Sequence, residues 1–332
     1  MLLSSKTTSS QTATHSIHPS AHRLSRRTLL KGVGGLAAAS FVGGGAAVAG
    51  SAPAQAALNV AEHEDQGRMQ YYKLATPSIG WLPRVNVLLP DAYDASRRYP
   101  VLYLLHGGGE DYSTFDTKYD IRNHTAERDL IVVMPDGGAA GWYSDPESSN
   151  VGPRNWETFH VDELIPWVDA TFSTIAQPAG RAVSGFSMGG FGALKYAAKH
   201  PELFGSVSCH SGPADLRIQD GAVVHWANFT AGATDLKGGT IYGIPWDQAR
   251  VSADNPVEHV ESYRGKRIFL VCGTESDRYE SIVLPSQQNF EKALDGAGIG
   301  YERYEDTGTH IVRWGRFQQD IDSMLNFLTK AG

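Results

Sequence analysis

Short runs of consecutive apolar residues recur between residues 101 and 275, and most of them end in glycine or polar residues. These runs are 101–105, 130–138, 182–190, 203–212 and 267–275. A continuous apolar run of this length, without alternation, predicts a strand buried on both faces, as in a parallel sheet. Further strands are expected at 68–78, 83–90 and 300–306.

Segments with apolar residues at roughly helical spacing separate several of these strands. They predict helices at 156–172, 188–200, 285–299 and 313–329, and Pro166 is expected to kink the first. Strands that alternate with helices indicate an α/β fold, with a mostly parallel central sheet flanked by helices. The segment near 213–265 is rich in Gly, Trp and Tyr and weak in periodicity, so we expect an irregular insertion there.

The N-terminal segment has the features of an export signal. Arg26 and Arg27 precede a weakly hydrophobic Gly/Ala run at 33–50, and Ala54-Gln55-Ala56 has the small-x-small pattern of a signal-peptidase site. The segment 1–56 therefore resembles a twin-arginine signal, expected to be cleaved after Ala56. The run is too short and Gly-rich to span a bilayer well, so no stable membrane span is expected after cleavage.

The charge balance argues against nucleic acid as a partner. Five of the 29 basic residues lie in 1–56, which contains no acidic residue. Residues 57–332 thus carry 24 basic against 36 acidic residues, a formal charge of −12. Such a surface repels phosphate backbones, so we expect no nucleic-acid partner. The length of the segment 57–332 fits one large α/β catalytic domain.

Two cysteines, Cys209 and Cys272, lie near the ends of predicted neighbouring strands. The predicted positions of the two strands would allow a disulfide between them. We favour two buried free thiols, because a twin-arginine substrate folds before export in a reducing cytoplasm. Without clustered histidines they form no zinc-site pattern, and no metal is expected.

The sequence GFSMG, residues 185–189, joins a predicted strand to a predicted helix. Gly-x-Ser-x-Gly at such a junction is typical of a nucleophile held on a strained turn, where glycines remove side chains that would clash. Ser187 is therefore the predicted nucleophile. The backbone N–H of Met188, at the positive end of the helix, is a predicted oxyanion donor.

A serine nucleophile needs a base and a carboxylate that orients it. Of the histidines, His310 lies in the loop between the last strand and the last helix, which fits the order Ser, acid, His. The acid should follow the strand at 267–275, where Glu275, Asp277 and Glu280 are available. We choose Asp277, and a shifted loop would select Glu275 or Glu280 instead.

The loop HGGGE, residues 106–110, follows another predicted strand and offers the second oxyanion donor. Gly108 is the expected donor and Gly107 its competitor, because glycines let the backbone approach a substrate closely. The candidate substrate-binding residues are His106, Trp142, Trp156 and His210. The alternative for the aromatic side chains is that they belong to the core.

Taken together, these motifs resemble the esterase D / S-formylglutathione hydrolase superfamily of α/β hydrolases, which includes feruloyl esterases and secreted mycolyltransferases. The resemblance covers residues 80–330 and rests on YLLHGGGED, WETFHVDELIPWVD, GFSMGGFGALKYAAKHPELF, CGTESDRY and GTHIVRWGR. It implies a Ser-Asp (or Glu)-His triad and no cofactor. Ser276 departs from the family's usual Gly-Thr-Glu-Asp and puts the acid in question.

The expected function is that of a secreted serine carboxylesterase that acts through an acyl-enzyme on a small-molecule, carbohydrate or lipid ester. The alternative is an acyltransferase that moves the acyl group to a sugar or lipid hydroxyl. The HGGG loop differs from that of the mycolyltransferases, which have a bulkier residue there, and this favours hydrolysis. A secreted binding protein on an inactive hydrolase fold is a third hypothesis, which the complete set of triad candidates disfavours.

Overall fold

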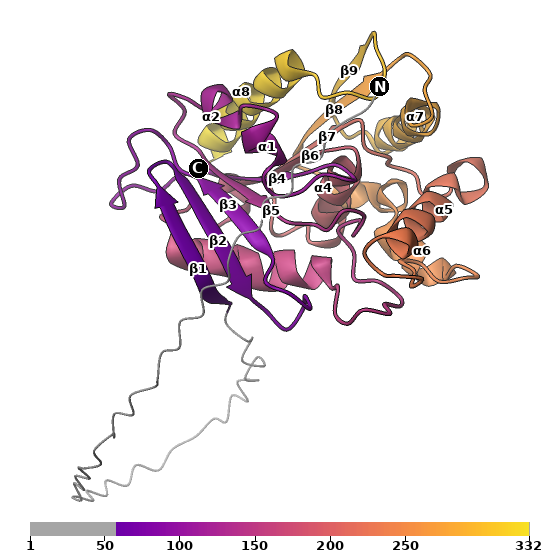
Figure 1. Ribbon diagram of the computed structural model, residues 1–332. Coiled ribbons are helices and arrows are strands. Elements are labelled where there is room, and N and C mark those ends of the chain that lie inside the picture. The colour runs from indigo at the N-terminus through magenta and orange to yellow at the C-terminus, as the bar shows by residue number, and fades with distance from the viewer. Residues whose placement is uncertain (1–57, 332) are drawn as a thin grey trace, which may run out of the picture. The chain divides into compact units, whose positions relative to one another are not determined.

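The computed structural model describes residues 58–331, with side chains described to residue 328 (Figure 1). The predicted export segment, residues 1–56, lies outside the described residues. Within 58–331, no helix is both long and apolar enough to cross a membrane.

Within this part of the chain, nine strands form one sheet in the order β1-β2-β3-β5-β4-β6-β7-β8-β9 (Figure 1). The pairs β1–β2, β2–β3 and β3–β5 are antiparallel, and every pair from β5 to β9 is parallel. The strands are β1 (Asn59–Gln66), β2 (Met69–Ala75), β3 (Arg84–Leu88), β4 (Val101–Leu105), β5 (Ile131–Pro135), β6 (Arg181–Phe186), β7 (Ser206–His210), β8 (Arg267–Gly273) and β9 (Glu302–Asp306).

The structure confirms the mostly parallel sheet. Every residue of β4, β5, β6, β7 and β8 is buried, as their continuous apolar runs predict. The antiparallel strand β1 was not predicted, because all eight of its residues are exposed and its sequence is polar.

Helices cover both faces of this sheet (Figure 1). On one face, Phe115, Ile121 and Phe317 pack with sheet residues such as Leu102 and Val132. These three come from α1 (Thr114–Thr117), α2 (Ile121–His124) and α8 (Trp314–Ala331). The larger core on the other face includes α3 (Ile165–Thr171), α4 (Met188–Lys199) and α7 (Glu280–Ala297).

The helix predicted at 156–172 changes its winding along its length. Its first part, η1 (Thr158–Leu164), is a wide π-type helix, and α3 follows directly. Pro166 lacks the N–H that an α-helix would donate to the carbonyl of Asp162, which accounts for a change of winding at this point. The remaining short helical turn before β6 is η2 (Pro178–Gly180).

Helix α7 begins at Glu280, five residues before the predicted start at Pro285. Pro285 lies inside the helix and cannot donate to the carbonyl of Ser281. The side-chain amide of Gln219 donates to that carbonyl instead, over 3.0 Å. The helix therefore accommodates a proline that the sequence pattern predicts as its first residue.

The segment 213–265 is more regular than expected. It holds α5 (Ile218–Ala233), α6 (Gln248–Asp254) and the tighter helix η3 (Pro256–Tyr263). Residues Gln219–Gly221 have positive φ angles of 50–82°, which bends the start of α5. Helix α5 was not predicted, because its sequence contains glycines and threonines and its buried side is narrow. That side includes Val223, Val224, Ala227 and Ala231.

Candidate active site

Ser187 lies on the tight turn between β6 and α4, with φ 55° and ψ −118°. This sparsely populated conformation requires the chain to turn back closely upon itself. A Cβ atom at Gly185 would lie 2.4 Å from the backbone of Gly189, and one at Gly189 would lie 2.1 Å from the carbonyl oxygen of Leu105. Both glycines of GFSMG are therefore required by backbone contacts.

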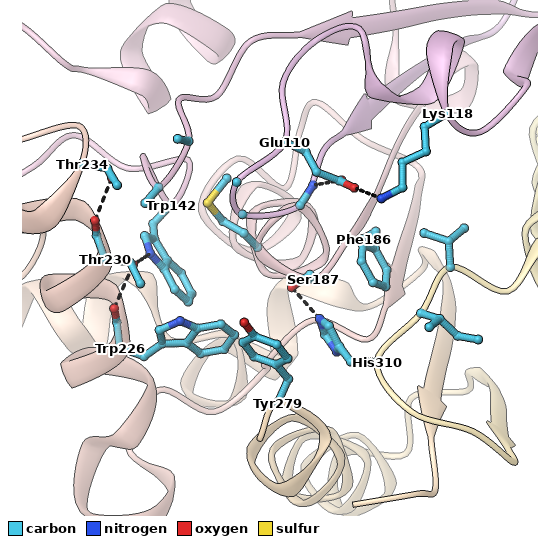
Figure 2. Close-up of a pocket in the computed structure, with 18 of the residues that line it drawn as sticks. Glu110, Lys118, Trp142, Phe186, Ser187, Trp226, Thr230, Thr234, Tyr279 and His310 are labelled. Carbon is cyan, nitrogen blue, oxygen red and sulfur yellow. Dashed lines mark hydrogen bonds and ion pairs between the residues drawn. The ribbon is translucent and has the colours of Figure 1, made fainter. Parts of the chain in front are cut away.

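His310 follows β9, in the loop before α8, and its ring lies beside the serine (Figure 2). The distance between His310 Nε2 and Ser187 Oγ is 2.8 Å. The ring is flanked by Phe186, at a centroid distance of 4.9 Å, and by Tyr279, at 5.0 Å. The predicted nucleophile and base are thus within hydrogen-bonding distance.

The carboxylate that faces the other ring nitrogen of His310 belongs to Glu280. Its Oε1 atom lies 3.3 Å from His310 Nδ1, and the side chain is buried. The Ser211 hydroxyl donates to the same oxygen over 2.7 Å, and the Cys272 thiol donates to Oε2 over 2.9 Å. Burial alone would raise the pKa of Glu280, but hydrogen bonds from His310, Cys272 and Ser211 outweigh it and lower this pKa below its usual range.

Asp277, the residue chosen from the sequence, does not contact the His310 ring. Its Oδ2 accepts the backbone N–H of His310 over 3.0 Å, and its Oδ1 accepts the N–H groups of Tyr279 and Glu280 over 2.8 and 2.7 Å. Asp277 thus caps the first turn of α7 and ties the histidine loop to it. The third candidate, Glu275, is exposed. The expectation of Asp277 at the ring is corrected to Glu280.

A sequence signal for this arrangement was available. Asp277 and Glu280 are three residues apart, the spacing of a helix-capping residue and the acidic residue that follows it. Interpreted in this way, the pattern assigns Asp277 to the helix cap and leaves Glu280 free to point inward. The apparent start of the helix at Pro285 obscured the signal.

The ring of His106 holds the backbone of the loop 106–109. His106 is 1% exposed, with Nδ1 2.9 Å from the carbonyl oxygen of Gly107 and Nε2 2.9 Å from the backbone nitrogen of Gly137. Because Gly137 N–H can only donate, Nε2 is the acceptor and Nδ1 carries the proton. The C=O and N–H of a trans peptide point in opposite directions, so holding Gly107 C=O orients Gly108 N–H.

Gly108 and Met188 both line the pocket beside Ser187. The neighbouring N–H groups are already occupied: Gly107 N–H donates to Glu110 over 3.1 Å, and Gly109 N–H to Ala139 over 2.7 Å. Within residues 58–331, the N–H groups of Gly108 and Met188 have no acceptor. Of the two glycines considered as donors, Gly108 is therefore the one whose N–H is unoccupied.

The pocket has a volume of about 630 Å³, within the range of small-molecule sites (Figure 2). Trp142, Trp226 and Tyr279 form one wall, with Trp142 and Trp226 at a centroid distance of 5.0 Å and Trp226 and Tyr279 at 5.4 Å. Trp226 comes from α5, so the 213–265 segment supplies part of the site. Among the proposed substrate-binding residues, Trp142 lines this pocket.

The other three proposed substrate-binding residues do not line it. His106 is buried beneath the glycine loop. Trp156 packs against the 137–141 loop, where a Cβ at Gly141 would lie 2.3 Å from it. His210 lies 2.9 Å from Asp320 of α8 and contributes its backbone carbonyl, which accepts the Ser187 N–H over 2.8 Å.

Few charged groups line the pocket. Apart from His310 they are Glu110 and Lys118, which form an ion pair of 3.0 Å with each other. In the described part of the chain, no cluster of three or more His, Cys, Asp or Glu side chains could hold a metal ion. Cys209 and Cys272 are buried free thiols, as favoured from the sequence.

Several known proteins are similar to this chain in sequence or in fold. Residues 76–328 match the family described as "Putative esterase". The esterase Rv1288 of Mycobacterium tuberculosis is 56% identical over 283 residues, a match that covers 82% of this chain and 62% of that protein. The chain thus spans less than two thirds of that relative's length.

Two further similar proteins have names that describe different activities. The diacylglycerol acyltransferase/mycolyltransferase Ag85A of Mycobacterium bovis is 28% identical over 333 residues, which covers 93% of this chain and 92% of that protein. The structure of an S-formylglutathione hydrolase from Agrobacterium tumefaciens superposes with a TM-score of 0.65 at 20% identity, covering 82% of this chain and all of that one. The family match and the 56% identical relative establish that this chain belongs to the esterase family.

Proposed function

We propose that this protein is a serine carboxylesterase that hydrolyses an ester through an acyl-enzyme intermediate. The observation that carries the proposal is the hydrogen-bonded series Ser187, His310 and Glu280 beside two unoccupied backbone N–H groups. A serine becomes a useful nucleophile when an oriented base removes its proton. The esterase relative at 56% identity supports the same assignment.

In the proposed first half-reaction, Ser187 Oγ attacks the carbonyl carbon as its proton passes to His310 Nε2. The N–H groups of Gly108 and Met188 stabilise the negative oxygen of the tetrahedral intermediate. Glu280 stabilises the imidazolium, which then protonates the departing alcohol oxygen. Water repeats these steps on the acyl-enzyme, releases the carboxylic acid and returns the proton to Ser187.

We propose that the substrate is an uncharged ester. The two charged side chains that line the pocket besides the base, Glu110 and Lys118, neutralise each other. An aromatic wall of two tryptophans and a tyrosine favours an apolar or ring-shaped group over an ionic one. A thioester that carries free carboxylates would find no unpaired cation among the pocket-lining residues.

The decisive experiment compares the protein with Ser187→Ala on p-nitrophenyl esters of increasing acyl length and on aryl esters. We expect measurable hydrolysis by the unaltered protein and a loss of about 10⁴-fold or more in the variant, because members of a triad act as a unit. A fluorophosphonate should label the peptide that contains Ser187 and no other. Near-normal hydrolysis by the variant would refute the proposal.

Acyl transfer to a hydroxyl group is the second candidate, because the Ag85A relative is similar over nearly the whole chain. Transfer uses the same acyl-enzyme, and only the nucleophile in its second half differs. Products should be analysed with an acyl ester and an excess of a sugar or glyceride. A new ester as the main product would favour transfer, whereas free acid would favour hydrolysis.

We further propose that residues 1–56 direct export of the folded protein by the twin-arginine route. The support is the Arg26-Arg27 pair followed by the Gly/Ala run and the Ala54-Gln55-Ala56 site. Replacing both arginines by lysine should retain the full-length chain inside the cell. N-terminal sequencing of exported protein should begin at Ala57.

A further inference from the structure

Trp142, which lines the pocket, and the residue after it both have a backbone conformation that L-amino acids rarely adopt. Trp142 and Tyr143 both have φ 52°, and both side chains are buried. Bulky residues in the left-handed region are uncommon, and two in succession persist only where the surroundings hold them. We refer to residues 142–144 as the Trp142–Ser144 turn.

This turn sends two side chains to different parts of the active site. Trp142 forms part of the pocket wall, and its indole N–H donates to Thr230 Oγ1 over 3.0 Å (Figure 2). The hydroxyl of Tyr143 donates to the carbonyl oxygen of His106 over 2.9 Å, directly before the oxyanion loop. The turn thus connects the substrate wall with the peptide that precedes Gly107.

The Tyr143 ring reaches His106 through a space left by two glycines. A Cβ at Gly137 would lie 2.7 Å from this ring, and one at Gly192 would lie 2.6 Å from it. The ring is therefore enclosed on both sides. Its position depends on the backbone of the turn being held in place.

The group that holds this backbone is the ammonium of Lys195, on the same helix α4 that follows the nucleophile. Lys195 is fully buried. Its Nζ lies 3.0 Å from the carbonyl oxygen of Tyr143 and 2.7 Å from Ser144 Oγ. It also lies 2.8 Å from Glu157 and 3.1 Å from Asp254, so the buried charge is paired.

Lys199, one turn further along α4, provides an internal comparison. It contacts the same carboxylates, Glu157 over 2.9 Å and Asp254 over 2.8 Å. No contact joins it to the Trp142–Ser144 turn among the described residues, and its side chain is 28% exposed. Two lysines therefore share one pair of carboxylates, but only Lys195 contacts the turn.

The two carboxylates are held ionised. Burial would raise the pKa of Glu157, but Lys195, His200 and Lys199 lower it well below its usual range. The pKa of Asp254 is also lowered, because the two lysines outweigh the effect of its burial. A fixed pair of negative charges thus keeps the Lys195 ammonium in place beneath the turn.

We propose that Lys195 is a positioning residue that fixes the Trp142–Ser144 turn, and through it both the Trp142 wall of the pocket and the peptide before the oxyanion loop. Lys195 does not line the substrate pocket itself. Its influence on the reaction is exerted through Trp142 and Tyr143. The proposal rests on the serine-esterase function proposed above.

The test compares Lys195→Met with Lys199→Met, because each removes one cation from the same pair of carboxylates. For Lys195→Met we expect kcat on a short-chain p-nitrophenyl ester to fall at least tenfold, and the preference between short and aryl esters to change. For Lys199→Met we expect both quantities to stay within about twofold. Equal losses in the two folded variants would overturn the proposal, since they would indicate a general effect of the ion cluster.

A second variant and a second measurement keep the test independent of the folding of Lys195→Met. Tyr143→Phe removes only the hydroxyl that contacts His106, and kcat should fall severalfold with little change in KM. Hydrogen exchange of backbone amides at 139–145 should quicken in Lys195→Met and not in Lys199→Met. Unchanged exchange together with unchanged kcat in Tyr143→Phe would overturn the proposal, whereas an inactive unaltered protein would refute the esterase function instead.

Discussion

Glu280 Oε1 lies 3.3 Å from Nδ1 of His310, whereas Asp277, three residues earlier, accepts the backbone N–H of the same histidine. The two acidic residues at the start of α7 therefore contact different parts of His310. Glu280 faces the imidazole that becomes positive in the proposed mechanism. Asp277 fixes the loop that carries this imidazole.

This division predicts different effects for two matched amide substitutions. Glu280→Gln should lower kcat by roughly 10³–10⁴-fold, because the uncharged amide no longer stabilises the imidazolium or its tautomer. Asp277→Asn keeps one acceptor oxygen for the helix cap but loses the second, so the lost bond from His310 N–H should lower the free energy of unfolding by about 1 kcal/mol, with a much smaller effect on kcat. Steady-state kinetics and chemical denaturation measure the two effects. The reverse pattern of losses would restore Asp277 as the acid.

The structure explains why the contact between Ser187 and His310 was easier to predict from sequence than the carboxylate beside the His310 ring. Ser187 lies between two glycines that the tight turn requires within five residues of sequence. A local sequence pattern therefore identifies it. The acid depends on where α7 begins, and Pro285 suggests a start five residues too late. Which side chain then points inward depends on the cap formed by Asp277, a contact between backbone and side chain.

Two of the candidate substrate-binding residues lie away from the pocket for reasons that the sequence pattern does not show. Every residue of β7 is buried, so its sequence does not show which face each side chain occupies. His210 consequently points toward Asp320 and Phe317 of α8 and away from the pocket. Trp156 is an aromatic residue of the core, which was the stated alternative.

Two glycine substitutions should affect stability in opposite directions. Gly189→Ala places a Cβ 2.1 Å from the Leu105 carbonyl oxygen, so we expect a loss of about 1–3 kcal/mol or more in unfolding free energy. Gly296 lies in α7 with no atom within 4 Å of an added Cβ, and Gly296→Ala should add about 0.5–1 kcal/mol. Thermal and urea unfolding report both. A stable Gly189→Ala protein would contradict the close contact between the elbow and β4.

Stability should fall in acid through Asp320, a buried aspartate that does not line the pocket. Burial opposes the ionised form of Asp320, but Arg267 and His210 outweigh it and lower its pKa to about 2. A carboxyl group with a lowered pKa stabilises the fold above its unfolded-state pKa, near 4, and this contribution is lost as the pH falls through the folded value. The loss attributable to Asp320 should be roughly 2 kcal/mol between pH 4 and pH 2.

Asp320→Asn provides the control for this prediction. The variant should be less stable at neutral pH, because Arg267, whose Nη2 lies 2.8 Å from Asp320 Oδ1, loses the negative charge that it faces. Its stability should also change less between pH 4 and pH 2 than that of the unaltered protein. Parallel pH curves for the two proteins would show that Asp320 is not the titrating group.

Both thiols should resist modification while the protein is folded. Burial raises the pKa of the Cys209 thiol to about 12 and also raises that of Cys272, so neither is present as thiolate near neutral pH. Iodoacetamide should alkylate neither cysteine in the native protein and both after unfolding without reductant. Failure to alkylate the unfolded protein would indicate a disulfide in place of two free thiols.

His106→Ala tests whether this histidine acts on the oxyanion site or on the substrate. The side chain holds Gly107 C=O and accepts Gly137 N–H, and it does not line the pocket. Its loss should let the peptide before Gly108 reorient, and kcat should fall by about 10²-fold with KM nearly unchanged, as when an oxyanion donor is removed.

His106→Asn should recover part of this loss, because its side-chain N–H can still donate to Gly107. His225→Ala, at an exposed position on α5, should leave both constants unaltered. A raised KM with an unchanged kcat would instead place His106 in contact with substrate, as first expected from the sequence.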